Sequence, residues 1–388
     1  MATKELKLIL SALVVAGATA ALILQHRAQI AGPIENQALR EQIAGFQTGV
    51  GDLSNRLLQL KAARTLPATA DPLLRTASPN ATLPGPIQTT NLYAMITNRT
   101  PQVKLTTAQL EAYLNENHRS ADSLLAAYRT SDDLALLREA MEKYPNEPLV
   151  GFEAALRKDA SPAERRQWLD IFKQSAPQNA LADYLSAADH FKAGQTDLGM
   201  QEMLAAASKP QFQTYSLDRI QAAEEAYRAA DFPEAEAKAL ASSQLLQPHL
   251  VQVRALEDNL LDLATSYQQA GDESSRQAVL GMAADLGQRF ESNSSGDTLI
   301  ARLMGINVER IALSAMDPSA AYASDGQTVQ GRLTELAQQR AGIKELATQA
   351  DPLLQTISSH DWISYQDRSL SFGEEAAMRW LVAKHVSP

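Results

Sequence analysis

The sequence predicts an all-α protein with an N-terminal transmembrane helix, a short coiled coil, and then an α-solenoid of helix hairpins with a C-terminal helical cap. Hydrophobic residues make up 45% of the 388 residues, enough for a core, whereas aromatic residues make up only 5%. Helix-capping motifs recur along the chain, and the apolar residues between them follow helical spacing. No stretch alternates as strands do, so we expect no sheet.

The charge and the lack of cysteine exclude several kinds of function. The net charge is −10, and general nucleic-acid binding requires a basic face, so we expect no nucleic-acid partner. The chain contains no cysteine. Disulfides, thiol nucleophiles and thiolate metal sites are therefore excluded, although no compartment is selected.

Residues 1–24 are predicted to form a membrane anchor. The run from Leu8 to Leu24 is apolar and uncharged. As a helix it covers most of a hydrocarbon core of about 30 Å. The alternative is a signal peptide cleaved after Ala20, because residues 18–20 resemble an A-x-A site. We expect the anchor to stay, because the apolar run continues beyond Ala20.

The few charges beside this run predict its orientation. Lys4 and Lys7 precede it, and Arg27 is the strong base that follows it. By the positive-inside rule, the chain is a single-pass membrane protein whose N-terminus is cytoplasmic and whose body is periplasmic or extracellular.

Residues 25–64 are predicted to form a coiled-coil helix. Apolar residues follow a 3-4 spacing from Leu39 to Leu60, and Asn36 occupies an a position. β-Branched residues at a and leucines at d favour a parallel homodimer. The alternative is a single amphipathic helix packed on the body, because glycines at positions 45, 49 and 51 weaken the helix. Residues 65–104 contain six prolines and are predicted to be an extended linker.

Residues 105–291 are predicted to form roughly five antiparallel helix hairpins. Thr106 and Gln109 make a capping box, and so do Ser161 and Glu164, with Pro162 at the first helical position. A hairpin of this size does not bury its apolar face alone, so stacking is expected to build a continuous core with a groove.

Prolines at 145, 177 and 210 are spaced 32 and 33 residues apart, and the segment 177–210 carries a recognisable pattern. Small residues at 187, 199 and 206 stand where two helices would cross, Phe191 closes the first helix, and Gly194 lies in the turn. This segment resembles a tetratricopeptide repeat (TPR). The resemblance implies a helical-repeat architecture and carries no activity.

The segment departs from the family pattern at two positions, and the pattern predicts where two other side chains lie. Asp183 stands where the family has a large aromatic residue, and Ser186 replaces a usual leucine. In this register Ala187 is expected to face the second helix of its hairpin. Glu202 is expected on the outer, solvated face.

Residues 292–388 are predicted to form a C-terminal helical region that caps the solenoid. We expect helices near 297–316, 325–349 and 371–385. The segment "DPLLQTISSHDWISYQD" is expected to interrupt them.

No catalytic, cofactor-binding or metal-binding residue is predicted. The six histidines are scattered, and no two stand at the helical spacing of a metal-binding pair. The neighbours His360 and Asp361 are interpreted as a turn or surface pair. The charged pairs at 165–166, 224–225 and 374–375 are interpreted as solvated. Four aromatic residues at helix ends are expected in the hairpin core: Tyr128, Phe191, Tyr227 and Tyr267.

These observations predict a non-enzymatic, membrane-anchored helical-repeat scaffold that binds a protein or peptide partner at the cell envelope. The alternative is an envelope enzyme or ligand sensor whose site is assembled from scattered residues. A groove would favour the scaffold, whereas a deep pocket with convergent polar groups would favour the enzyme or sensor.

Overall fold

The computed structural model describes residues 92, 103–245, 247–292, 298–322 and 326–386. All of them belong to one compact unit, Thr82–Pro388. The expected anchor (1–24) and coiled coil (25–64) lie outside the described residues, as does most of the expected linker. Within that linker region, Leu92 is buried in the hydrophobic core.

The described part of the chain is all-α, as predicted, and its β pairing is limited to two isolated bridges. No helix in these ranges is long and apolar enough to cross a membrane. The helices are α3 (Thr107–Glu116), α4 (Ala121–Ser131), α5 (Leu134–Lys143), α6 (Pro148–Ala155), α7 (Pro162–Ser175), α8 (Ala180–Lys192), α9 (Thr196–Ala207), α10 (Ser216–Ala229), α11 (Glu234–Ser243), α12 (Pro248–Ala270), α13 (Glu273–Ser292), α14 (Leu299–Ser314), α15 (Val329–Gln355), α16 (Ser359–Phe372) and α17 (Glu374–Val386).

Both predicted capping boxes are confirmed. The Thr106 side chain accepts from the backbone N–H of Gln109 at the start of α3, and the Gln109 side chain accepts from the N–H of Thr106. Ser161 and Glu164 do the same at the start of α7. These contacts satisfy backbone donors that a helix start otherwise leaves unpaired, and they fix where the two helices begin.

Successive helices pack in pairs, and this packing is consistent with a helical repeat. The pairs α4–α5, α6–α7, α8–α9 and α10–α11 are in close contact. Between α8 and α9, Gly194 adopts a φ of +72°, which allows a tight turn. A Cβ on Gly199 would lie 2.8 Å from the Phe191 ring, so any other residue at this helix crossing would displace that ring.

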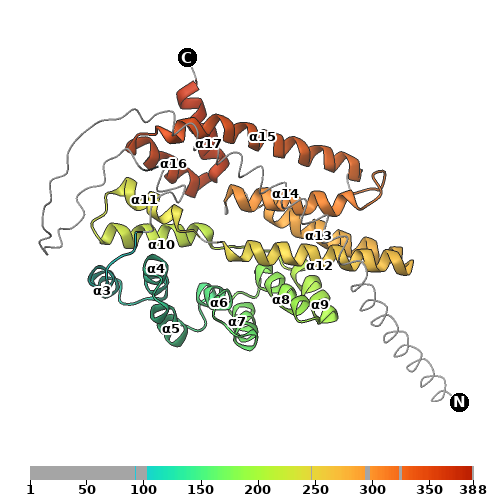
Figure 1. Ribbon diagram of the computed structural model, residues 1–388, viewed down its shortest axis with the longest axis horizontal. Helices are drawn as coiled ribbons and strands as arrows, with labels where there is room; N and C mark the ends of the chain where they lie inside the picture. The colour runs from blue at the N-terminus through green and yellow to red at the C-terminus, as the bar shows by residue number, and fades with distance from the viewer. Residues whose placement is uncertain (1–91, 93–102, 246, 293–297, 323–325, 387–388) are drawn as a thin grey trace, which may run out of the picture. The chain divides into compact units, whose positions relative to one another are not determined.

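The chain then doubles back on the row formed by α3 to α9. Helix α10 packs against α3 and α4, and α12 packs against α8 (Figure 1). The Tyr227 hydroxyl on α10 donates to the carbonyl of Val103 at 2.7 Å. In a linear repeat stack each repeat contacts only its neighbours. Here α10 and α12 cover the row, so cavities can form between these returning helices and the row.

The expected interruption before the C-terminus is wrong. Helix α15 continues through Pro352 to Gln355, and α16 covers most of the segment that was expected to break the helices. Pro352 lies in the last turn of α15, so its ring removes only one late helical hydrogen bond. Helix α16 has its own start, because the Ser358 side chain accepts from the N–H of Asp361.

Candidate functional site: a cationic cavity

A cavity of about 720 Å³ lies where the returning helices cover the row. Helix α4, α6 and the loop after α6 form one side, and α10 with the start of α12 forms the other. We call it the cationic cavity. It is lined by Lys104, Tyr128, Arg129, Thr130, Asp132, Leu134, Glu153, Leu156, Arg157, Lys158, Asp159, Arg219, Gln244, Gln247, Pro248 and Val251.

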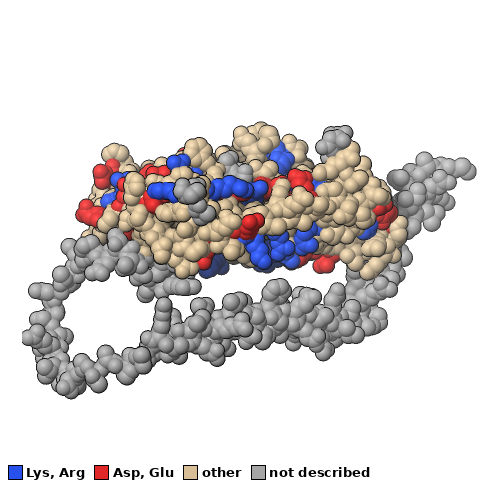
Figure 2. Space-filling model, turned by 90° about the horizontal axis from the view of Figure 1, so that it is seen from above, with Lys and Arg blue, Asp and Glu red and all other residues tan. Residues whose placement is uncertain are grey.

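The lining carries an excess of positive charge although the chain as a whole is acidic. Five lining residues are basic and three are acidic, whereas the net charge of the chain is −10. Lys and Arg also gather near the middle of the face seen in Figure 2, so charge is unevenly distributed on the surface as well. Such a local excess attracts anions even to a protein with negative net charge.

Glu153 holds two arginines at the centre of the lining. Its Oε1 accepts from Arg129 Nε at 3.0 Å and from Arg129 Nη2 at 2.7 Å. Arg219 Nε lies 2.8 Å from the same oxygen. The three side chains come from α6, α4 and α10, so this contact ties the returning helix to the row.

The burial of Glu153 follows from its helix. Every residue of α6 from Val150 to Ala155 is buried, so a carboxylate in this helix has no solvated face to occupy. A buried charge is strongly unfavourable unless it is paired and hydrogen-bonded. The two arginines supply that pairing.

Electrostatics keep this centre ionised. Burial disfavours the charged carboxylate, but the Arg219 and Arg129 guanidiniums outweigh burial and hold the pKa of Glu153 below its usual value. Burial lowers the pKa of Arg219, and the Glu153 charge opposes that change. Arginine is protonated across the physiological range, so one negative charge is shared by two positive ones.

Hydrogen-bonding capacity remains in the lining. Arg129 Nη1 is buried and has no hydrogen-bond partner among the described residues. Arg157, whose side chain is only 6% exposed, pairs with the half-exposed Asp159 at 3.2 Å. Guanidinium donors bind carboxylate and phosphate oxygens in defined, often bidentate geometry. The lining can therefore hold an anionic group.

Several interpretations of charged pairs are wrong because the partners lie on neighbouring helices. Glu224 is buried and pairs with Lys238 of α11 at 2.9 Å. Arg166 donates to Asp189 of α8 at 3.1 and 2.8 Å. Glu374 accepts from the backbone N–H of Leu299 at 2.8 Å.

The remaining interpretations concern the neighbours His360 and Asp361 and the four aromatic residues expected in the core. The turn or surface interpretation holds for His360, which is exposed, but not for Asp361, which is buried in the first turn of α16 and pairs with Lys384 of α17. Tyr227 is fully buried. The other three aromatic residues expected in the core are partly buried and pack against it.

The register of the repeat-like segment is half correct. Ala187 is fully buried, as expected. Glu202 is not on a solvated face, because it is half-buried and binds Lys173 of α7 at 2.7 Å. The polar departures have partners as well: Asp183 pairs with Lys209, and Ser186 accepts from Lys173 at 3.4 Å.

Sequence reasoning missed the cationic cavity. Its three central residues stand on helices distant in sequence, so no motif joins them. One clue was present: Glu153 stands inside the otherwise uncharged stretch "LVGFEAAL", and a lone carboxylate there indicates a buried charge with a distant partner.

Neither a known protein family, a curated protein nor a solved structure matches the chain. Within the described ranges, no group of three or more His, Asp or Glu side chains is arranged to hold a metal ion.

Proposed function

We propose that this protein is a non-enzymatic, membrane-anchored helical-repeat scaffold that binds a protein or peptide partner at the cell envelope. We propose further that the cationic cavity holds an acidic segment of that partner. The observation that carries this proposal is the pairing of Arg129 and Arg219 with a single carboxylate, Glu153, beside a cavity with excess positive charge.

An acidic segment fits the cavity on two counts. Carboxylate side chains would balance the excess positive charge, and the buried Arg129 Nη1 offers a donor without a partner. Lys104 and Lys158 are exposed at the cavity and would meet the segment as it approaches. Charges at such a rim mainly steer association and fix its register.

The TPR-like architecture is part of this proposal. It is supported in the segment 177–210 by the buried Ala187 and by the close approach of Gly199 to Phe191. The two departures from the pattern, Asp183 and Ser186, are compatible with it because each has a lysine partner.

The membrane attachment rests on the sequence. We propose that Leu8 to Leu24 anchors the chain, with the N-terminus cytoplasmic and the body periplasmic or extracellular, and that Leu39 to Leu60 forms a parallel homodimer. Carbonate washing should leave the full-length chain in the membrane fraction. A mature N-terminus at Ala21 would contradict the anchor.

The test of the partner site uses two matched charge reversals in the full-length, tagged chain. Lys104→Glu/Lys158→Glu changes the cavity rim, and Lys192→Glu/Lys344→Glu makes the same change of net charge at exposed lysines elsewhere. Complexes are captured from native membranes. The proposal expects a partner that is retained by the second variant, lost by the first, and released from the unmodified chain by salt.

Equal recovery of every captured protein by the two variants would contradict the proposal. Circular dichroism of both variants verifies that a loss of binding is not a loss of fold.

A further inference from the structure

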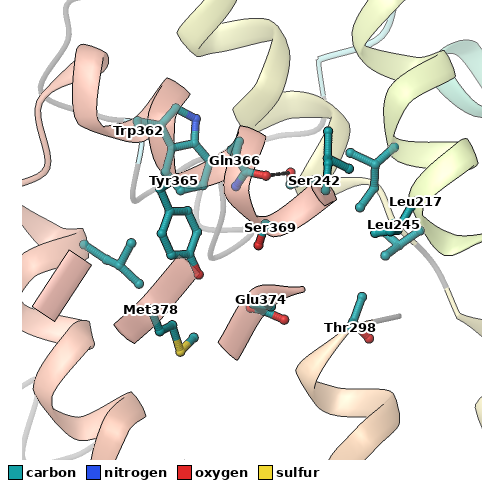
Figure 3. Close-up of a pocket in the computed structure, with 13 residues that line it drawn as sticks. Leu217, Ser242, Leu245, Thr298, Trp362, Tyr365, Gln366, Ser369, Glu374 and Met378 are labelled. Atoms are coloured by element: carbon teal, nitrogen blue, oxygen red, sulfur yellow. Dashed lines mark hydrogen bonds between the residues drawn. The ribbon is translucent and has the colours of Figure 1, made fainter. Parts of the chain in front are cut away.

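A second cavity, of about 190 Å³, lies among α10, α11, α15, α16 and α17 (Figure 3). We call it the apolar cavity. Most of its wall is apolar: Leu217 and Ile220 come from α10, Leu245 follows α11, and Leu370 and Met378 come from α16 and α17. It is independent of the proposed partner site, although α10 contributes both to this wall and, through Arg219, to the cationic cavity.

One charged residue lines this cavity. Glu374 is the only acidic residue in the lining, and no lysine, arginine or histidine of the described residues stands there with it. Its Oε2 accepts the backbone N–H of Leu299 at 2.8 Å. Burial raises the pKa of Glu374, and that single backbone hydrogen bond opposes the change. The carboxylate therefore has no cation beside it in the cavity wall.

Two aromatic residues complete the wall. Trp362 is 1% exposed and stacks on Tyr365, with ring centroids 5.6 Å apart. Trp362 Nε1 is buried and has no hydrogen-bond partner among the described residues. Gln366 is held in place because its Oε1 accepts from the Ser242 hydroxyl at 3.1 Å. The wall thus combines apolar surface, aromatic rings and one carboxylate.

We propose that the apolar cavity binds a small aromatic amine, with its ring among the apolar side chains and its ammonium group at Glu374. A cavity of about 150 Å³ lined by apolar side chains accommodates benzene, so this one has room for a single substituted ring. A cationic amine supplies the counter-charge that the lining lacks. Aromatic rings nearby add favourable interactions with a cation.

The experiment uses benzylamine and its uncharged counterpart, benzyl alcohol, with the full-length chain. Binding is measured by equilibrium dialysis and located by fluorescence. Trp362 is one of three tryptophans, so Trp168→Phe/Trp380→Phe leaves it as the single reporter. We expect saturable benzylamine binding with a change in Trp362 emission.

Glu374→Gln is the decisive variant because it keeps the shape of the side chain and an oxygen for the Leu299 N–H. We expect it to weaken benzylamine binding about tenfold or more, since the ammonium group then loses its charged hydrogen-bond partner. Benzyl alcohol binding should change little. Glu345→Gln, an exposed position on α15, is the matched control and should leave both ligands unaffected.

Three results would overturn the proposal: no saturable benzylamine binding, equal benzylamine affinity of Glu374→Gln and Glu345→Gln, or binding without a response from Trp362. Ser369→Leu, which places extra atoms in the cavity, is expected to abolish binding of both ligands. None of these results depends on the acidic partner segment.

Discussion

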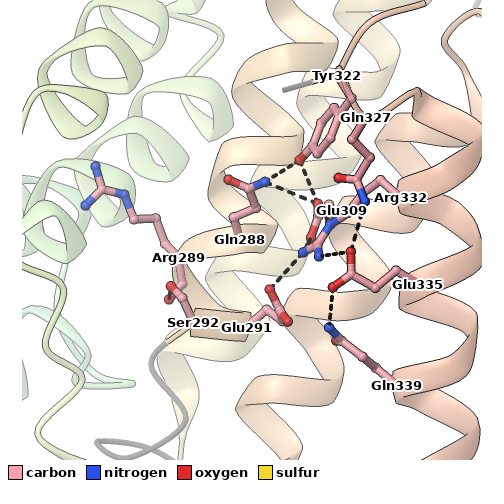
Figure 4. Close-up of polar contacts among 10 residues, drawn as sticks. All are labelled: Gln288, Arg289, Glu291, Ser292, Glu309, Tyr322, Gln327, Arg332, Glu335 and Gln339. Atoms are coloured by element: carbon pink, nitrogen blue, oxygen red, sulfur yellow. Dashed lines mark hydrogen bonds and ion pairs between the residues drawn. The ribbon is translucent and has the colours of Figure 1, made fainter. Parts of the chain in front are cut away.

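Two buried arginine–glutamate clusters in this molecule differ in their ratio of arginine to glutamate. In the cationic cavity, Arg129 and Arg219 share one carboxylate, Glu153. In the second cluster, which we call the Arg332 network, one arginine meets three carboxylates that join α13, α14 and α15 (Figure 4). The same residue types are thus combined with opposite excess charge.

The Arg332 network is saturated from within the chain. Arg332 Nε and Nη2 donate to the fully buried Glu309 at 2.7 and 2.9 Å. Glu291 and Glu335 each lie 2.9 Å from the same guanidinium, and the Tyr322 hydroxyl donates to Glu309 at 2.6 Å. Such a network stabilises the fold and leaves little capacity for a ligand.

The two clusters differ in their capacity to bind an anion. Burial and ion pairing are common to both, so neither property marks a binding site. The cationic cavity differs because it has excess charge, an unpaired donor at Arg129 Nη1, and a space beside them. Substitutions in the two clusters separate charges that stabilise the fold from charges that bind.

The largest expected effect is that of Arg332→Leu. The substitution leaves Glu309 buried without its cation, and breaking a buried pair in this way costs about 3–5 kcal/mol. The free energy of unfolding is measured by urea denaturation of the full-length chain at pH 7. Arg332→Leu/Glu309→Leu should recover much of the loss, because both charges are then absent. A loss below about 1 kcal/mol would contradict the structural role of this network.

Glu153→Gln is expected to cost about 3 kcal/mol at pH 7, because two buried arginines lose their shared counter-charge. The pKa of Glu153 is lowered in the folded protein, so its stabilisation is present above its unfolded value of 4.5 and is lost as the pH falls through the folded value. The difference in the free energy of unfolding between Glu153→Gln and the unmodified chain should therefore become smaller below pH 4.5. A difference independent of pH in this range would contradict the ion pairing.

Between pH 7 and pH 5.5, His249, which follows the lining residue Pro248, predicts a smaller effect on the free energy of unfolding. The ring is fully buried, with its centroid 5.7 Å from that of Phe152, and burial lowers its pKa to about 3. The unfolded chain binds a proton at this residue below pH 6.5, whereas the folded chain does not. Stability should therefore fall as the pH is lowered from 6.5 toward 3, by up to about 1.4 kcal/mol per pH unit.

His249→Phe should remove this part of the pH dependence, and the exposed His360→Gln should retain it. Urea denaturation at pH 7 and pH 5.5 provides the comparison. The same slope in both variants would contradict the lowered pKa of His249 in the folded protein.

The smallest expected effect on stability is that of the rim variant, Lys104→Glu/Lys158→Glu. Both lysines are exposed, and surface charge changes usually alter the free energy of unfolding by less than about 1 kcal/mol. A large loss in urea denaturation would mean that the rim, like the Arg332 network, serves the fold.

Local features of the fold could be predicted from the sequence. Caps such as those at Thr106 and Ser161 depend on residues three positions apart, so the sequence contains all the information. The pairing of α8 with α9 around Ala187 could also be predicted, because the two helices are consecutive in the sequence. Pro352 misled the prediction because the effect of a proline depends on its place in the helix, and it lies in the last turn.

The candidate site could not be predicted, because its partners are brought together by the return of α10 onto the row. Arg129, Glu153 and Arg219 meet only through that packing. The interpretation of Glu224 and Glu202 as solvated is wrong for the same reason, because each pairs with a lysine on an adjacent helix. A residue's own helix periodicity does not reveal which charge faces it from another helix.

The most direct test of the central claim is the binding of an acidic peptide to the cationic cavity. Fluorescein-labelled hexaglutamate is titrated with the full-length chain and followed by anisotropy, with hexaglutamine as the uncharged control peptide. We predict salt-sensitive binding of hexaglutamate that weakens about tenfold or more in Lys104→Glu/Lys158→Glu and is unchanged in Lys192→Glu/Lys344→Glu. Equal affinity of the two variants, or equal binding of the two peptides, would contradict the assignment of this cavity as the partner site.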